Sequence, residues 1–142
     1  MSKSDFIENA LLLQIFNGTG ITGLTDNTAT APLTNLYVSL HTADPGEAGT
    51  QTTSECTYTS YARVAVARTS SGWTVTGNSV SPVANIDFPA ATGGTETATF
   101  FAIGYTASGA GNIIYSGSLS PTISISSGVT PRITTATTVT ED

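Results

Sequence analysis

The sequence predicts an all-β protein, an antiparallel β-sandwich of the eight-stranded jelly-roll type, with one short N-terminal α-helix. The composition is the first indication: only 10% of the residues are charged, whereas 27 are Thr and 16 are Ser, which suits half-exposed strands. The second is that short β-rich runs recur about every ten residues after residue 35, separated by Gly, Pro, Ser or Asn. The third is that no helical pattern separates these runs, which excludes a parallel βαβ sheet.

The length of 142 residues fits a single domain over residues 1–142. We expect an N-terminal helical segment at residues 1–17, an irregular connection at 18–34 and the β-sandwich at 35–142. The connection is rich in Gly, Thr, Asn and Pro without periodicity, and irregular segments of such length are often either functional or poorly ordered.

The helix is predicted over residues 4–17 because both of its ends carry signals. Ser4 is an N-cap residue, Asp5 and Glu8 complement the positive end of the helix dipole, and Asn17-Gly18 is a stop signal. Apolar residues recur at Ile7, Leu11 and Ile15, so one face needs a partner surface. That surface is either the same domain or another subunit.

The strands follow the connection in order, and their apolar residues alternate along the chain. In the run 122–126, for example, Ile123 and Ile125 point one way and the serines the other, so one face is core and the other is wet or meets a neighbour. The predicted strands are residues 36–41, 58–69, 73–76, 84–88, 97–106, 112–119, 122–126 and 132–140.

The charge balance and the ends of the chain exclude several classes of protein. A net charge of -6 provides no basic patch for a phosphate backbone, so we expect no direct nucleic-acid partner. Cys56 is the only cysteine and cannot form an internal disulfide, as is usual for proteins assembled in a reducing cytoplasm. The opening apolar run is too short for a membrane span and lacks the features of a signal peptide, so no membrane partner is expected.

The stretch "LYVSLHTADPGEAGT" brings His41 close to Asp44 and Glu47 and could be a site or a strand that runs into a turn. A zinc site needs further His or Cys ligands, and the chain has no second histidine. His41 ends a strand by period, and Pro45-Gly46 is typical of a turn. We therefore interpret the stretch as a strand followed by a turn, with a structural or surface histidine.

The remaining polar motifs do not indicate a catalytic, cofactor or metal site. Asp44, Glu47 and Glu55 could in principle act as glycosidase acids or bind calcium, but their spacing does not match a calcium loop, and loop carboxylates are normally solvated. The glycine motifs at 18–20 and 93–95 do not precede a helix and lack the following lysine of a phosphate-binding loop. We predict no catalytic residues, no cofactor and no metal.

Aromatic residues of the predicted strands are large enough to dominate a sandwich core, and we assign most of them to it. A sugar-binding platform would use the same residues exposed, so a lectin stays open. These residues are Trp73, Phe88, Phe100, Phe101, Tyr105 and Tyr115.

The order of the segments resembles the small tail-fibre-like or head-decoration proteins of tailed bacteriophages. The most specific segments are "LYVSLHTADPG" and "YARV", followed by "FPAAT", "FFAIGYTASGAGNIIYSGSL" and "ISSGVTPRI". Similar proteins often carry Trp-Gly before the fifth strand, where this chain has "TGGTETAT". The resemblance implies a virion structural protein without a catalytic centre, assembled in the host cytoplasm.

A compact sandwich without repeats, coiled coil or collagen-like tract has little that builds a fibre shaft, which favours a capsid decoration, or cement, protein on the capsid exterior. Its expected partners are the major capsid protein and itself, as a homo-dimer or homo-trimer, because the edge run 132–140 carries only one charge to block pairing. A tail fibre or adhesin component that contacts the host surface is the alternative, and an enzyme such as a depolymerase is a distant third.

Overall fold

The structure is a computed structural model that describes residues 5–20 and 33–141. Within these residues, the chain forms one helix and nine strands arranged in three antiparallel sheets. Contacts divide the chain into two compact units, Met1–Asn35 with Ala67–Asn85 and Thr134–Asp142, and Leu36–Val66 with Ile86–Ile133. The predicted single domain over residues 1–142 stays a prediction.

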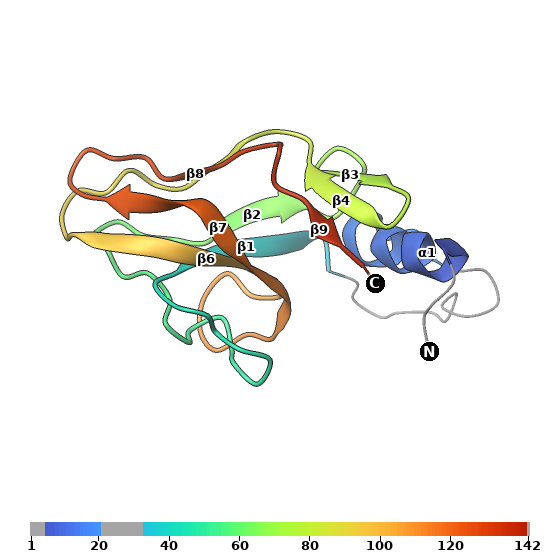
Figure 1. Ribbon diagram of the computed structural model, residues 1–142, viewed down its shortest axis with the longest axis horizontal. Helices are drawn as coiled ribbons and strands as arrows, with labels where there is room; N and C mark the ends of the chain where they lie inside the picture. The colour runs from blue at the N-terminus through green and yellow to red at the C-terminus, as the bar shows by residue number, and fades with distance from the viewer. Residues whose placement is uncertain (1–4, 21–32, 142) are drawn as a thin grey trace. The chain divides into compact units, whose positions relative to one another are not determined.

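The first unit consists of a helix packed on a small sheet. Helix α1 (Asp5–Asn17) contacts β3 (Trp73–Thr76) and β4 (Ser79–Pro82), and the sheet has the order β3-β4-β9, with β9 at Val139–Thr140 (Figure 1). Leu12 and Phe16 are fully buried, and the ring of Phe16 meets that of Trp73 edge-on at 4.7 Å between centroids. This side of the helix therefore packs on its own chain, which was the first of the two partner surfaces predicted for it.

The end of α1 is fixed by backbone geometry and by one arginine. Gly18 adopts a positive φ of 67°, the conformation that a helix-terminating glycine takes without steric cost. The guanidinium of Arg68 donates to the carbonyls of Gln14 and Ile15, so a cation satisfies the free carbonyls at the negative end of the helix. The predicted stop is confirmed, whereas the predicted cap Ser4 lies outside the described residues.

The second unit contains a four-stranded sheet of order β2-β1-β6-β7 and a two-stranded sheet of β5 and β8. β1 (Asn35–His41) and β6 (Glu96–Gly104) pair from Tyr37 opposite Gly104 to His41 opposite Phe100. The other elements are β2 (Val64–Ala67), β5 (Ile86–Asp87), β7 (Ile113–Ile125) and β8 (Arg132–Ile133). Figure 1 shows β6 and β7 as the long strands of this unit.

The core of the second unit lies on one face of the four-stranded sheet. Val38 and Leu40 alternate with Ser39 and His41 along β1, yet all four are buried. Both faces of β1 are therefore covered. The connection after β1 covers its polar side, where the carbonyl of Thr53 lies 2.8 Å from Nδ1 of His41. The core side chains are Leu36, Val38, Leu40, Tyr58, Ile86, Phe88, Phe101, Ile103, Ile125 and Ile133.

Several strand boundaries differ from the prediction for reasons of pairing. The predicted strands 112–119 and 122–126 are one strand, β7, although Pro121 lies between them. Proline is tolerated there because β7 is an edge strand and its register to β6 shifts between residues 118 and 123. Ser124 is exposed and Ile125 buried, so the alternation predicted for this run is confirmed.

The predicted strand 132–140 is divided into β8 and β9 by a turn in which the amide of Thr137 donates to the carbonyl of Thr134. Of the predicted strand 58–69, only Val64–Ala67 forms a strand, and of the predicted strand 84–88, only Ile86–Asp87 does. Strand β4 was not predicted. Mostly antiparallel β structure with one helix is confirmed, but a jelly roll of eight strands is not: the described residues form nine strands in three sheets.

Candidate interaction site

The connection after β1 begins with a tight turn, residues 42–49, that we call the acidic turn. The amide of Gly46 donates to Oδ1 of Asp44 at 2.9 Å, and Gly46 itself has a φ of 69°. Asp44, Gly46 and Glu47 are exposed, whereas Pro45 is buried. His41 ends β1 before this turn, so the predicted strand and turn are confirmed.

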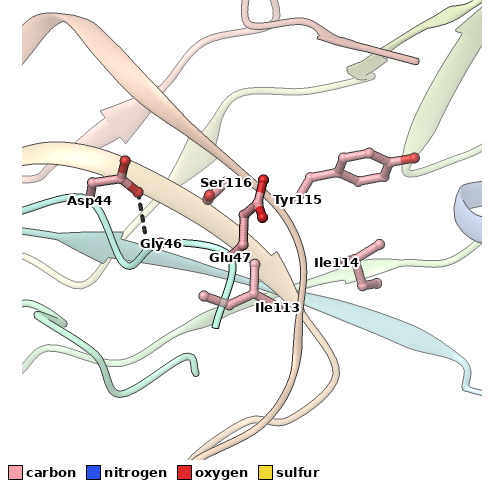
Figure 2. Close-up of a pocket in the computed structure, with 7 residues that line it drawn as sticks. All are labelled: Asp44, Gly46, Glu47, Ile113, Ile114, Tyr115 and Ser116. Atoms are coloured by element: carbon pink, nitrogen blue, oxygen red, sulfur yellow. Dashed lines mark hydrogen bonds between the residues drawn. The ribbon is translucent and has the colours of Figure 1, made fainter. Parts of the chain in front are cut away.

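A groove of about 480 Å³ separates the acidic turn from the start of β7, and we call it the edge groove. Its lining consists of Asp44, Gly46, Glu47, Ile113, Ile114, Tyr115 and Ser116 (Figure 2). In Figure 2 the ring of Tyr115 extends away from the two carboxylates, whereas Ile113 and Ser116 lie on the side of Glu47. The groove offers negative charge on one wall and apolar and hydroxyl groups on the other.

A buried ion pair fixes the rest of the connection. Arg63 Nε and Nη2 donate to the two carboxylate oxygens of Glu55 at 2.7 and 2.8 Å, and the side chains are only 2% and 13% exposed. The hydroxyl of Tyr61 donates to the same carboxylate at 2.9 Å. A two-pronged pair of this kind fixes the geometry of both side chains.

The same arginine holds residues 105–111, which we call the clamped loop. Arg63 Nη1 donates to the carbonyl of Thr106 at 2.9 Å and Nη2 to that of Gly109 at 2.8 Å. The buried side chain of Gln51 accepts from the amide of Thr106 at 3.1 Å. A Cβ on Gly111 would lie 2.1 Å from Oγ1 of Thr106 and 2.4 Å from Oε1 of Gln51, so a larger residue here would displace these two side chains.

The clamped loop exposes its tip while its backbone is held. Tyr105 is 42% exposed, and the next exposed positions, Ala107 to Ala110, are small residues. Binding residues are often placed on loops that a rigid scaffold positions. The arrangement is therefore suited to surface contact.

His41 is buried on the polar face of β1 and serves structure. Its Nδ1 lies 2.8 Å from the carbonyl of Thr53 and its Nε2 2.9 Å from the hydroxyl of Ser39. A neutral ring fits both contacts when Nδ1 donates to the carbonyl and Nε2 accepts from the hydroxyl. Burial lowers the pKa of His41. This effect is larger than that of the hydrogen bond to the carbonyl of Thr53, which by itself would raise the pKa.

Glu96 organises the segment around Cys56. Its Oε1 accepts from the amides of Thr57 and Tyr58 at 2.8 and 2.7 Å. Burial, followed by the nearby charge of Glu96, raises the pKa of the Cys56 thiol to about 12. The thiol therefore stays protonated near neutral pH, which makes it a poor nucleophile.

The structure separates the carboxylates that the sequence grouped. Asp44 and Glu47 line the edge groove, whereas Glu55 is bound to Arg63 and is not part of the lining. In the described part of the chain, no three His, Cys, Asp or Glu side chains gather as a possible metal site. The predictions of no metal, cofactor or catalytic residue stay predictions.

The aromatic residues expected in the core divide into three groups. Trp73, Phe88 and Phe101 are buried, Phe100 and Tyr115 are half-buried, and Tyr105 is exposed. Sequence reasoning missed the Arg63 clamp and Gln51, because their partners in the clamped loop lie more than 40 residues away along the chain.

A comparison with protein families matches residues 2–141 to the family described as Podophage GP4 fiber I protein gp80. The chain belongs to this family. It is therefore a structural protein of tailed phages, located in the virion, and the tail-fibre-like resemblance is confirmed. The family's description fits the alternative of a tail fibre or adhesin component better than capsid decoration.

A comparison of this chain with curated proteins found no match. Among the residues that the structure describes, no helix is long and apolar enough to cross a membrane.

Proposed function

We propose that this protein is a structural component of a tail fibre and that it contributes to contact with the host surface. The observation that carries the proposal is the family match over residues 2–141, since the family is described as a fiber protein. Capsid decoration, which the sequence favoured, has no comparable support. The protein acts without catalysis, and copies of it assemble as a homo-oligomer.

The clamped loop supports a role in contact. Arg63 and Gln51 fasten its backbone before any partner arrives, so little conformational entropy is lost when its tip is bound. Tyr105 presents an exposed aromatic ring at the start of the loop, and tyrosine is enriched in protein-binding surfaces. The small residues at the tip allow close approach.

Competition for the host surface tests the proposal. We expect the purified protein, or antibodies raised against it, to slow phage adsorption while leaving the temperature of DNA release from the heads unchanged. A Tyr105→Ala variant should compete less well than a Tyr37→Ala variant, whose ring is half-buried on β1. A lowered temperature of DNA release after antibody treatment, with normal adsorption, would support capsid decoration instead.

A further inference from the structure

We propose that uptake of a proton by His41 releases the clamped loop, so that pH regulates the surface through which the protein makes contact. The two are joined by residues 50–56, which we call the latch segment. This segment contacts the ring of His41 and supplies two side chains that fasten the loop, Gln51 directly and Glu55 through Arg63. The inference rests on the proposed function, because that function assigns host contact to the same loop.

The latch segment is attached to the end of β1 around His41. His41 and Glu55 form an isolated antiparallel bridge. Backbone hydrogen bonds of 2.8 Å join the residues on either side of His41 to Ser54 and Cys56. The ring itself adds a further bond, in which Nδ1 donates to the carbonyl of Thr53 at 2.8 Å. A change in the charge of this ring therefore acts directly on the latch segment.

The latch segment holds the clamped loop near both of its ends. The buried side chain of Gln51 accepts from the amide of Thr106 at 3.1 Å. The amide of Gln51 donates to the carbonyl of Gly111 at 2.8 Å. The carboxylate of Glu55 orients Arg63, whose guanidinium donates to loop carbonyls. Movement of the latch segment away from β1 therefore removes the contacts that fix the loop.

The groups that surround His41 do not provide a free counter-charge. Two charged side chains act on its ring, Glu55 from the latch segment and Arg63 from the residue before β2. Both oxygens of Glu55 already accept from Arg63. The residues of β6 that pair with β1 are uncharged. The neighbouring Cys56 and Tyr61 stay neutral near pH 7, because burial raises the pKa of both groups.

A charged ring at this position costs free energy chiefly because it is buried. The side chain of His41 is fully buried, and burial lowers its pKa from the usual value of 6.5. The contact with Ser39 does not oppose protonation, since that hydroxyl can turn to the carbonyl of Ala102 at 3.4 Å and accept from the charged ring. The proton therefore favours a state in which the ring is hydrated.

The latch segment is the part that opens when the ring is hydrated. On one side of His41, β1 pairs with β6 over five consecutive residue pairs. On the other side, the latch segment pairs with β1 through the isolated bridge. Below pH 6.5 the opened state binds the proton more tightly than the closed state, so opening becomes more frequent as the pH falls, by at most about tenfold for each pH unit.

Hydrogen exchange of the full-length protein, followed by NMR at several pH values between 7.5 and 5.5, tests the coupling. Exchange rates are divided by the intrinsic rate at each pH, and the ring of His41 is titrated in the same samples. We expect faster exchange at the hydrogen-bonded amides of Gln51, Cys56 and Thr106 as the ring takes up its proton. The amides of Phe88 and Ala91, which bond to residues outside the latch segment, should not change.

Two variants provide the matched comparison. His41→Gln removes the group that binds the proton and keeps a side-chain amide that can donate to the carbonyl of Thr53. It should lose the pH dependence of the loop amides, whereas Asp44→Asn, at an exposed carboxylate of the acidic turn, should keep it. Equal pH dependence in His41→Gln would overturn the inference. In the unmodified protein alone, loop exchange that does not follow the titration of His41, or that rises equally at Phe88, would also overturn it.

Competition with phage adsorption at pH 7.5 and 5.5 extends the test to host contact. The purified protein should compete less well at pH 5.5, and His41→Gln should compete equally at both values. An equal loss of competition by His41→Gln would overturn the regulation. Absence of competition at either pH, with pH-dependent loop exchange still observed, would instead contradict the proposed function, so the two failures are distinguishable.

Discussion

His41 shows how burial turns one residue into a source of pH-dependent stability. Its pKa in the folded protein lies below the usual value of 6.5, chiefly because burial disfavours the charged ring. Between the lowered pKa and 6.5 the unfolded chain binds more protons than the folded one, so stability rises with pH through this window. The contribution of His41 is therefore complete above 6.5 and is lost as the pH falls.

We expect the free energy of unfolding in urea to fall between pH 7.5 and pH 5, and to fall less in a His41→Gln variant. The variant removes the group that takes up the proton, while the carboxylates that also titrate remain. Equal pH dependence of the two proteins would show that His41 does not contribute. Circular dichroism at each pH provides the unfolding curves.

Arg63 and Arg132 form a matched pair of ion-pairing residues that differ in burial. Arg63→Met leaves the carboxylate of Glu55 without its partner in a nearly buried site, which should cost about 3 kcal/mol or more of stability. Arg132→Met breaks an ion pair with Asp87 in which both side chains are about half exposed, so the loss should be much smaller. Similar urea midpoints for the two variants would contradict the assignment of Arg63 as the central clamp.

At the scale of elements, α1 depends on its contact with the sheet of the first unit. Phe16→Ala removes a fully buried ring that packs on Trp73, and we expect a loss of about 3–5 kcal/mol. Leu33→Ala, at a side chain that is 42% exposed, should change stability by no more than about 0.5 kcal/mol. A small effect of Phe16→Ala would mean that the helix does not contribute to the stability of this unit.

Elements with local signals were predictable, and elements made by distant pairing were not. The helix end at Asn17-Gly18 and the strand ending at His41 follow from capping and periodicity within a few residues. β4 has only one large apolar residue, Val80, and is a strand because it pairs with both β3 and β9. β7 continues through Pro121 because an edge strand needs fewer backbone donors.

The same distinction holds for the candidate site. The acidic turn was predictable because Asp44, Pro45 and Gly46 are local turn formers. The edge groove was not, because Ile113–Ser116 are brought to Glu47 only by the order of the strands. The sequence also grouped Glu55 with Asp44 and Glu47, and the structure instead binds it to Arg63.

At the scale of the whole molecule, the proposed location of the protein is the tail fibre rather than the head. The family match supports this assignment, while the compact β units with few charges agree equally with either location. Composition and fold class therefore identify a phage structural protein, and its position in the virion has to be observed directly.

Gold-labelled antibodies against the protein, imaged by electron microscopy on intact virions, would show where the protein lies. We expect label on the tail fibres and none on the head surface, with particles that lack the protein as the unlabelled control. Label distributed over the head, with bare fibres, would contradict it and return the protein to capsid decoration.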